Sequence, residues 1–306
     1  MSRQLRFIPD GGALVEVTCR TLQGRFLLRP SPTLDEIIVG VLGRAQRRYK
    51  VRVCGYMFAS THFHLLLDVD TAKQLARFMG YVASNIAREV SRLHGWKDKI
   101  WSRRYQGIVV SGEEEAQVAR LRYILANGTK EGLTARPQDW PGVHVARALV
   151  QGEDLTGTWF NRTQEYTARN RGETFDRLKY ASPEILHLSP LPCWKHLPEK
   201  VWRDRAINLI HGIEAEAAIK RSRTGSQPPG ASAILGRHPH ERPKHLQKSP
   251  APLFHTASAK VRRELWTAYR WFVASFREAA DKLRAGDRNA AFPLGSFPPA
   301  LPFVSS

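Results

Sequence analysis

The chain has 306 residues, of which 42% are hydrophobic and 25% are charged, values typical of a soluble globular protein with a substantial core. This length predicts one large domain or two modest ones. The 47 Lys and Arg residues outnumber the 28 Asp and Glu residues and give a formal net charge of +19. A field of that sign attracts polyanions, of which nucleic acid is the commonest. No basic amphipathic helix with an apolar insertion face indicates a membrane surface instead, and no apolar run reaches the roughly 18 residues of a membrane span.

The cysteines indicate a reducing compartment. Cys19, Cys54 and Cys193 lie far apart, with no C-x-x-C spacing. Such a set predicts neither a zinc cluster nor a disulfide framework, and an odd count suits a reducing cytoplasm. The N-terminal residues lack the apolar core of a signal peptide. We therefore expect a cytoplasmic protein.

Seven elements are predicted in the first half of the chain from apolar periodicity, capping residues and breakers. Thr33 with Glu36, and Ser111 with Glu114, form capping-box signals at the starts of two helices, and Gly95 ends another. In order, the predicted elements are a strand over 13–21, a helix from Thr33, strands over 51–57 and 62–69, a helix over 71–95, a strand over 107–110 and a helix over 112–127.

This order predicts the fold class. Strand, helix, two strands, helix and strand, followed by one more helix, suggest the βαββαβ ferredoxin-like arrangement. It is an α+β fold with an antiparallel sheet and helices on one face. The strand over 62–69 would then lie inside the sheet.

After Leu133 the periodic signal weakens, and we expect an α-helical, Pro-rich and basic C-terminal extension. The predicted division is a sheet domain over 1–150 and the extension over 151–306. Within the extension the predicted segments are a helix over about 199–220, a basic linker or arm over 224–257, a helix over about 258–285 and an extended tail from Phe292 to Phe303.

The strand predicted over 62–69 carries two histidines in an otherwise apolar run, His62-Phe63-His64. Because successive side chains of a strand point to opposite faces, His62 and His64 project from the same face. Two imidazoles on such a strand are costly unless something uses them, and neutral imidazole is the commonest metal ligand among side chains. The tripeptide alone fits a metal site and a pair of core histidines equally well.

The helix predicted over 112–127 presents a second group of functional side chains. At about 100° per residue, Tyr123 and Asn127 fall opposite the apolar stripe and lie one above the other at i and i+4. A helix that packs its stripe on the sheet and turns this second face to a neighbouring strand would bring both near His62 and His64. The stripe itself comprises Val118, Leu121 and Leu125.

A His-hydrophobic-His strand followed by Tyr-x-x-x-Asn on a later helix resembles the single-tyrosine HUH transposases, and most closely the REP-associated tyrosine transposases. Residues 17–25 resemble that family's first strand, residues 100–107 its "LWQGRF"-like stretch, and residues 121–133 its "YIELNPVRAGL"-like helix end. The resemblance runs from about residue 10 to 150. The histidine motif alone is weak, whereas four segments in the right order are specific.

The sequence departs from the family pattern at three places. The usual "PNH" before the first histidine is Ser60-Thr61-His62, and "NPVRAG" is replaced by residues 127–132, which read Asn-Gly-Thr-Lys-Glu-Gly. The histidine often found in the first strand is absent, and Val15 and Glu16 occupy that region. The predicted metal set is intact.

The resemblance implies a DNA transposase that cleaves and rejoins single-stranded DNA by transesterification. Tyr123 would attack phosphorus, form a 5′-phosphotyrosine and leave a free 3′-OH. Because tyrosine titrates near pH ~10 and is mostly protonated, the phosphate must be activated. A divalent cation, Mg²⁺ or Mn²⁺, held by His62, His64 and the Asn127 amide oxygen would polarise it.

The expected partner is single-stranded DNA containing a hairpin, and the organism a bacterium. Arg103 and Arg104 follow Trp101 closely, and aromatic plus guanidinium groups suit single-stranded DNA, although a plain surface loop is the alternative. The sequence does not choose between a monomer and a homodimer, and no membrane partner is expected. The predicted DNA-binding residues are Arg20, Arg25, Arg103, Arg104, Arg120 and Lys130.

Other readings remain open at this point. Tyr81 and Tyr105 are alternative nucleophiles, but neither has a ligand-type partner at i+4 on a polar helix face. His238-Pro239-His240 is a second H-x-H, which lies in the predicted arm without strand context and suits a solvated or DNA-contacting stretch. The alternative functions are an HUH replication initiator or relaxase, which typically carries a third histidine or paired tyrosines, and a domesticated, non-catalytic DNA-binding protein.

Overall fold

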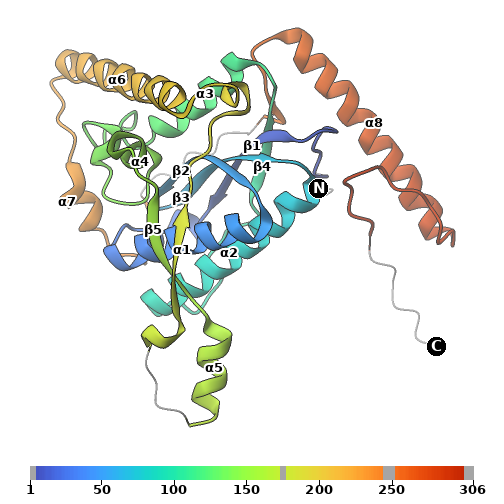
Figure 1. Cartoon of the computed structure of the whole chain (residues 1–306), viewed down its shortest axis with the longest axis horizontal. Helices are drawn as coiled ribbons and strands as arrows, with labels where there is room; N and C mark the ends of the chain where they lie inside the picture. The colour runs from blue at the N-terminus through green and yellow to red at the C-terminus, as the bar shows by residue number, and fades with distance from the viewer. Residues whose placement is uncertain (1–4, 173–176, 244–251, 300–306) are drawn as a thin grey trace.

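A computed structural model describes residues 5–172, 177–243 and 252–299 of the chain (Figure 1). Part of the predicted basic arm, residues 244–251, and the end of the predicted tail, residues 300–306, lie outside the described residues.

A five-stranded sheet forms the centre of the molecule. Its first four strands are β1 (Ala13–Arg20), β2 (Arg52–Ala59), β3 (His62–Val69) and β4 (Gln106–Val110), and they pair antiparallel in the order β2-β3-β1-β4. The fifth strand, β7 (Phe254–His255), pairs parallel to β4 at the edge. The predicted α+β fold with an antiparallel sheet is confirmed, and β3 lies inside the sheet.

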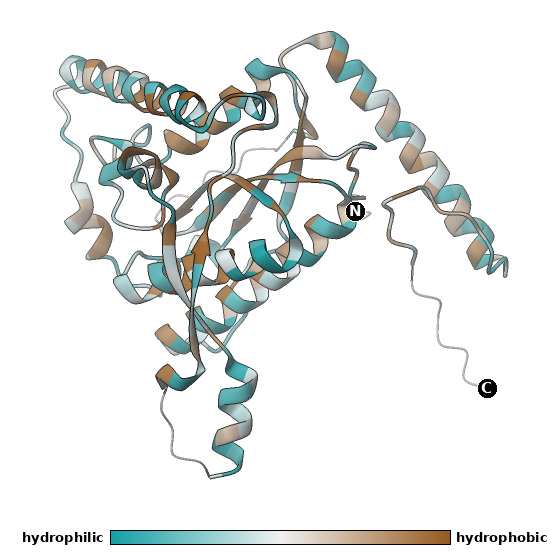
Figure 2. Cartoon of the chain, viewed as in Figure 1, coloured by the Kyte–Doolittle hydropathy of each residue, from teal (hydrophilic) through white to brown (hydrophobic). Residues whose placement is uncertain are grey.

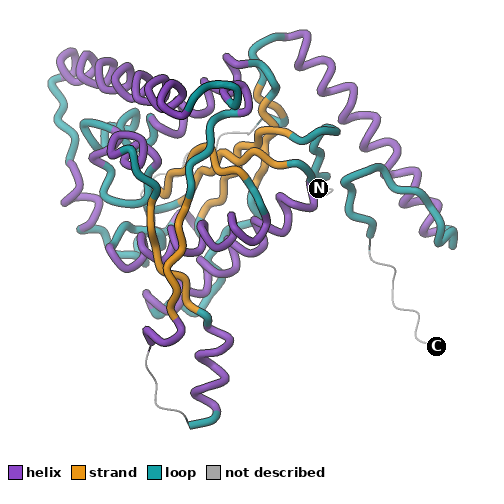
Figure 3. Tube along the Cα trace, viewed as in Figure 1, coloured by secondary structure: helices purple, strands orange, loops and turns teal. Residues whose placement is uncertain are grey.

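Helices cover both faces of the sheet (Figure 3). On one face, the space beside Gly107 of β4 is filled by Leu75 of α2 (Ala72–His94), which packs beside α1 (Pro32–Tyr49). On the other face, the space beside Gly55 of β2 is filled by Leu121 of α3 (Glu114–Leu125). The expectation that the helices share one face therefore holds for α1 and α2, whereas α3 lies opposite them.

Two of the predicted helix starts are wrong by a few residues. The N-cap of α1 is Ser31 rather than Thr33, because Pro32 fits the first helical position and the Ser31 hydroxyl accepts from Leu34 N at 3.3 Å. Helix α3 begins after Glu113 rather than Ser111, whose hydroxyl instead donates to the Glu113 carboxylate at 2.7 Å.

The chain after residue 150 adds a ribbon that sequence analysis did not predict. Strands β5 (Leu155–Phe160) and β6 (Ala181–Leu186) pair antiparallel and pack on α1. Gly40 of α1 permits this contact, because a Cβ there would lie 2.2 Å from the Thr158 carbonyl carbon. The remaining helices of the described chain with α geometry are α4 (Val145–Gln151), α5 (Arg162–Asn170), α6 (Glu199–Thr224), α7 (Gly230–Leu235) and α8 (Ala259–Arg284).

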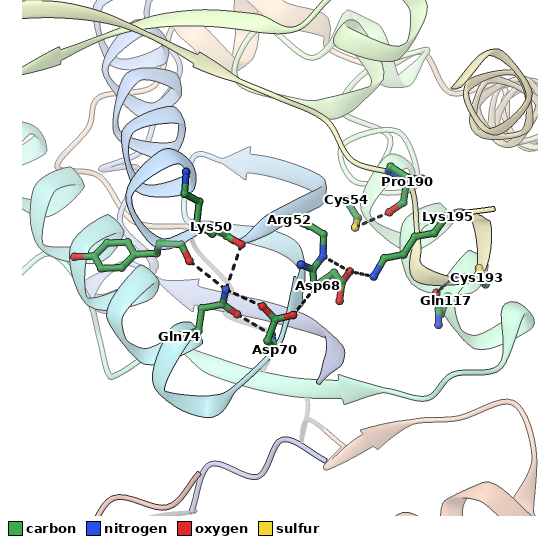
Figure 4. Close-up of polar contacts among 11 residues, drawn as sticks. Lys50, Arg52, Cys54, Asp68, Asp70, Gln74, Gln117, Pro190, Cys193 and Lys195 are labelled. Atoms are coloured by element: carbon green, nitrogen blue, oxygen red, sulfur yellow. Dashed lines mark hydrogen bonds and ion pairs between the residues drawn. The ribbon is translucent and has the colours of Figure 1, made fainter. Parts of the chain in front are cut away.

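Polar contacts fasten the segment before α6 to the sheet and to α3 (Figure 4). Asp68, buried on β3, forms ion pairs with Arg52 at 2.6 Å and with Lys195 at 2.7 Å. Gln117 of α3 accepts a hydrogen bond from Cys193 N at 3.1 Å. The later part of the chain thus packs closely on the earlier part, and the predicted division near residue 150 stays a prediction.

Hydrophobic residues concentrate along the strands of the central sheet, and hydrophilic residues recur along α6 and α8 (Figure 2). Within the described residues, no helix has the length and apolar character needed to cross a membrane.

Candidate functional site

His62 and His64 lie on the face of β3 that α3 covers. In the sheet His62 pairs with Arg20 of β1, and His64 pairs with Thr18. The two imidazole centroids are 5.1 Å apart, with His64 buried and His62 half-buried. The alternation of the strand therefore places both rings together, as its sequence predicts.

A buried carboxylate fixes the orientation of His64. The Nδ1 atom of His64 lies 3.0 Å from Glu16 Oε1 on the adjacent strand β1. An ionised carboxylate only accepts hydrogen bonds, so Nδ1 carries the proton and the Nε2 lone pair is left for a ligand. His62 Nδ1 lies 2.9 Å from the Thr61 hydroxyl, which can donate or accept and so leaves the His62 tautomer open.

His62 is held in its neutral form. Burial lowers the pKa of His62 to about 3, and the charges of His64, Arg20 and Lys130 act in the same direction. A neutral imidazole at physiological pH is the form that binds metal ions.

Tyr123 lies against His64, with ring centroids 5.5 Å apart in an edge-on arrangement. Two cations flank the tyrosine ring: Lys130 Nζ lies 3.3 Å from its centroid, and Arg120 Cζ lies 4.8 Å from it. Each cation is attracted to the face of the ring. Each also lies near a carboxylate: Arg120 Nη1 is 3.5 Å from Glu16 Oε2, and Lys130 Nζ is 3.6 Å from Glu131 Oε1.

Asn127 is buried just beyond α3, which ends at Leu125 and not at Asn127. Its Nδ2 donates to the Tyr123 carbonyl at 2.8 Å, which points the amide oxygen in the opposite direction, away from that carbonyl. In the described part of the chain no hydrogen bond joins Asn127 to either histidine; its amide nitrogen also lies 3.5 Å from the Ile124 carbonyl.

The turn after Asn127 depends on a glycine. Gly128 has φ +86°, and a Cβ there would lie 2.8 Å from Trp140 Cε3. Trp140 is itself fixed to β2, because its indole nitrogen donates to the Phe58 carbonyl at 3.0 Å. The Gly128 amide donates to the Glu131 carboxylate at 2.7 Å. This packing ties the end of the Tyr123 helix to the sheet.

Replacing Gly128 with alanine is therefore expected to lower the free energy of unfolding by roughly 2–5 kcal/mol, since backbone strain and a clash with Trp140 add together. Chemical denaturation measures the change. Gly132→Ala is the matched control: Gly132 also has positive φ (+72°) but has open space around it, so a loss of only about 1 kcal/mol is expected. Equal losses in the two variants would contradict the role of Trp140.

His144 packs beneath the same turn and is fully buried. Burial lowers the pKa of His144 to about 3, and the charge of Arg147 lowers it further. The backbone carbonyls of Ile124 and Asn127 act in the opposite direction but do not offset this shift. Its Nδ1 accepts a hydrogen bond from Ala146 N at 3.0 Å and so caps α4.

Acid is therefore expected to destabilise the fold through His144. Because its pKa is depressed on folding, its contribution to stability is fully present above pH ~6.5 and is lost as the pH falls towards about 3. The loss should be on the order of a few kcal/mol. Denaturation between pH 7 and pH 4 should show a weaker pH dependence in His144→Asn, which can keep the cap. An unchanged slope in that variant would exclude His144 as the cause.

Sequence reasoning did not select Glu16, which contacts His64, or His255, which contacts Glu16. Strand β7 brings His255 Nε2 to 2.9 Å from Glu16 Oε2, and Arg120 Nη1 lies 3.5 Å from the same oxygen. Burial alone would raise the pKa of Glu16, but the close contacts with His255 and His64 outweigh it and hold that pKa well below its usual range. In the sequence, Glu16 could have been noticed as a glutamate inside the apolar run of β1.

Several of the predicted DNA-binding residues border this site. Arg20 ends β1 opposite His62, and its carbonyl accepts from Ser102 N at 2.9 Å, which places the loop of exposed Arg103 beside it. Arg104 follows in the same loop and is also exposed. Arg120 and Lys130 flank Tyr123, as described above.

Arg25 does not join this group. Its guanidinium lies 5.2 Å from the ring centroid of Trp96 and donates to the His240 carbonyl. His240 is part of the second H-x-H, and its Nε2 lies 3.0 Å from the His94 carbonyl. Arg25 and the His238–His240 stretch thus form a separate contact between the first half of the chain and the C-terminal arm.

The alternative tyrosines lie away from the histidines. The Arg6 guanidinium carbon lies 4.6 Å from the ring centroid of Tyr105, and burial raises the pKa of Tyr105 to about 12, which makes its phenolate form rarer. Tyr81 belongs to α2, on the opposite face of the sheet, and its ring packs against Tyr49 at 5.8 Å.

Residues 31–127 match the family model of IS200-like transposases. These residues form an IS200-like transposase domain. The predicted resemblance to transposases is confirmed by this match, whose range includes His62, His64, Tyr123 and Asn127. Glu16 and His255, which contact the IS200-like domain at His64 and Arg120, lie outside the matched range.

The chain is also similar to two solved structures. One is a REP-associated tyrosine transposase bound to a REP hairpin, at 18% identity and a TM-score of 0.38, over 50% of this chain and 87% of that one. The other is a candidate transposase from Deinococcus radiodurans R1, at 15% identity and a TM-score of 0.29, over 39% of this chain and 94% of that one. No curated protein matches the chain.

In the described residues, no group of three or more His, Cys, Asp or Glu side chains is arranged to hold a metal ion. The predicted ligand set, His62, His64 and Asn127, has only two side chains of these types, so this result does not test it. The set stays a prediction.

Proposed function

We propose that this transposase cleaves and rejoins single-stranded DNA with Tyr123 as its nucleophile. The observation that carries the proposal is the position of the Tyr123 ring, 5.5 Å from His64 on the face shared with His62, within an IS200-like domain. The +19 net charge supports a nucleic acid substrate.

The residues fit a divalent cation, Mg²⁺ or Mn²⁺. His64 directs Nε2 away from Glu16, His62 is neutral, and Asn127 offers an amide oxygen, which together make an N,N,O donor set. When bound, the cation would polarise the scissile phosphate. The imidazoles favour Mn²⁺ over Mg²⁺.

In the proposed reaction the Tyr123 hydroxyl oxygen attacks phosphorus, and the bond from phosphorus to the 3′ oxygen breaks. The products are a 5′-phosphotyrosine and a free 3′-OH, which takes up a proton. Arg120 and Lys130 would hold the phosphate near the tyrosine through their charges. Attack by a 3′-OH on the phosphotyrosine reverses the step and rejoins the strand without a high-energy cofactor.

The proposed DNA is a single strand with a hairpin, and a groove beside Tyr123 offers it a path. This groove lies between α3 and the β7–α8 region, and Arg120, which flanks Tyr123, is one of its lining residues. Guanidinium and aromatic groups in one groove suit phosphates and stacked bases. Residues lining it include Ala116, Arg120, Phe254, His255, Arg262 and Trp266.

Trp266→Ala is expected to weaken binding of a single-stranded oligonucleotide about 10-fold, because one base would lose its stacking partner. Fluorescence anisotropy measures this affinity. The matched control is Trp271→Ala on the same helix, since Trp271 is more exposed and does not line the groove. Equal weakening by both variants would argue against the groove as the DNA path.

Covalent trapping tests the function. The purified protein with Mn²⁺ and a hairpin-containing single strand should give an adduct that survives denaturing electrophoresis. Substrates labelled at one end or the other identify the attached fragment. Because the tyrosine would be joined to the 5′ phosphate of the downstream fragment, the label at the 3′ end should stay with the protein. No adduct across varied hairpins would favour a DNA-binding protein without catalysis.

We further propose that one chain forms a complete site, because α3 packs on the sheet of its own chain and brings Tyr123 to His64. A Tyr123→Phe chain mixed with a His64→Ala chain should then stay inactive, whereas recovered cleavage would indicate a site shared between two chains.

The proposed location of the protein is the bacterial cytoplasm.

A further inference from the structure

Glu16 connects the candidate metal ligand His64 to the C-terminal part of the chain. It is 3% exposed and lies in β1 between apolar neighbours. One oxygen, Oε1, bonds to His64 Nδ1 at 3.0 Å. The other, Oε2, has no well-aligned hydrogen bond within the described residues, but His255 Nε2 lies 2.9 Å and Arg120 Nη1 3.5 Å from it.

The fold fixes His255 independently of this contact. His255 lies opposite Val110 in the parallel pairing of β7 with β4, and its carbonyl accepts from Ser111 N at 2.9 Å. Immediately after it, the amides of Ala257 and Ser258 donate to the Glu113 carboxylate at 2.8 Å and 3.0 Å. His255 is therefore held beside Glu16 by backbone contacts on either side of it.

We propose that Glu16 is a positioning residue for His64, and that His255 holds Glu16 in the orientation this role requires. The inference rests on the metal site of the proposed function. A carboxylate that accepts from one ring nitrogen fixes the tautomer, aims the other nitrogen at the ion and increases its basicity. The C-terminal half of the chain thereby supplies a part of the nuclease site.

The burial of Glu16 supports this role. Removing a carboxylate from water is costly even when it is paired, and an apolar residue would fit the interior of β1 at lower cost. Arg120, which flanks Tyr123, shares the same carboxylate. A single buried anion thus connects the ring that would bind metal to the helix that carries the nucleophile.

Nuclear magnetic resonance of the metal-free protein tests the tautomer directly. Long-range proton–nitrogen correlations of the imidazole nitrogens should place the proton of His64 on Nδ1 in the wild type. In Glu16→Gln, whose side chain can donate as well as accept, the Nε2–H tautomer should become populated. Glu113→Gln is the matched control, because Glu113 anchors the same C-terminal segment without touching His64, and the wild-type tautomer is expected there.

Titration with Mn²⁺ alone, followed by electron paramagnetic resonance, tests the consequence. Glu16→Gln should bind Mn²⁺ about 10- to 100-fold more weakly than the wild type. His255→Gln should cause a smaller loss, and Glu113→Gln should stay within about twofold. Thermal unfolding of each variant verifies that it is folded.

Three results would overturn the proposal: a wild-type His64 protonated at Nε2, wild-type Mn²⁺ affinity in Glu16→Gln, or equal losses in Glu16→Gln and Glu113→Gln. These measurements use no DNA. If the tautomer and Mn²⁺ results are as expected but no covalent adduct forms, the positioning role stands and the proposed nuclease function fails alone.

Discussion

Tyr123→Phe is expected to abolish the covalent protein–DNA adduct and to lower strand cleavage by at least about 10³-fold. The substitution removes one oxygen atom and keeps the ring that packs on His64 and beneath Lys130. Metal binding and DNA affinity should therefore stay near their wild-type values. Denaturing gels measure the adduct, and anisotropy measures the DNA affinity.

Tyr105→Phe and Tyr81→Phe are the controls for this loss. Tyr105 has a raised pKa in its buried position, and Tyr81 packs on the far face of the sheet, so both variants should keep the adduct. An adduct that persists in Tyr123→Phe and disappears in either control would assign the nucleophile to another tyrosine.

His64→Ala is expected to reduce cleavage by on the order of 10²- to 10³-fold, because it removes one of the two imidazoles that would hold the cation acting on the phosphate. Chelation of divalent metal should have an equal or larger effect on the wild type. DNA binding should persist in both cases within about threefold, since the charges of arginine and lysine carry it. Cleavage and anisotropy assays on the same samples separate the two effects.

The second H-x-H provides the matched control for this experiment. His238 is exposed in the C-terminal arm, and its ring contacts only His240 among the described aromatic pairs. His238→Ala should cleave DNA at the wild-type rate. If His238→Ala lost activity while His64→Ala kept it, the predicted metal site would be in the wrong place.

The histidine face and its neighbour on α3 were predictable from local periodicity. A strand has a period of two, which places His62 and His64 together, and the spacing of Tyr123 and Asn127 keeps them close, although Asn127 lies just past the end of α3. The apolar stripe of α3 was less predictable. Val118 is half-buried while Ile124 and Gln117 are buried, because α3 also packs against α6 and so has two contact faces.

Other features depend on contacts that a local pattern does not contain. Pro183 inside β6 reads as a strand breaker, yet at the edge of a two-stranded ribbon it is tolerated. Strand β7 has only two residues, and its pairing with β4 sets it apart from the surrounding arm. The partnership of His255 with Glu16 could not be predicted, because it joins residues near opposite ends of the chain.

That partnership has a consequence for the timing of assembly. During synthesis, a nascent chain that has emerged up to Asn127 already carries both histidines and the tyrosine. Strand β7 and His255 are not yet made, and contacts between distant residues form slowly because a long loop must close first. The positioning of His64 is thus completed only when nearly the whole polypeptide has left the ribosome. A prematurely terminated product would carry the motif without the residue that supports His64, the proposed metal ligand.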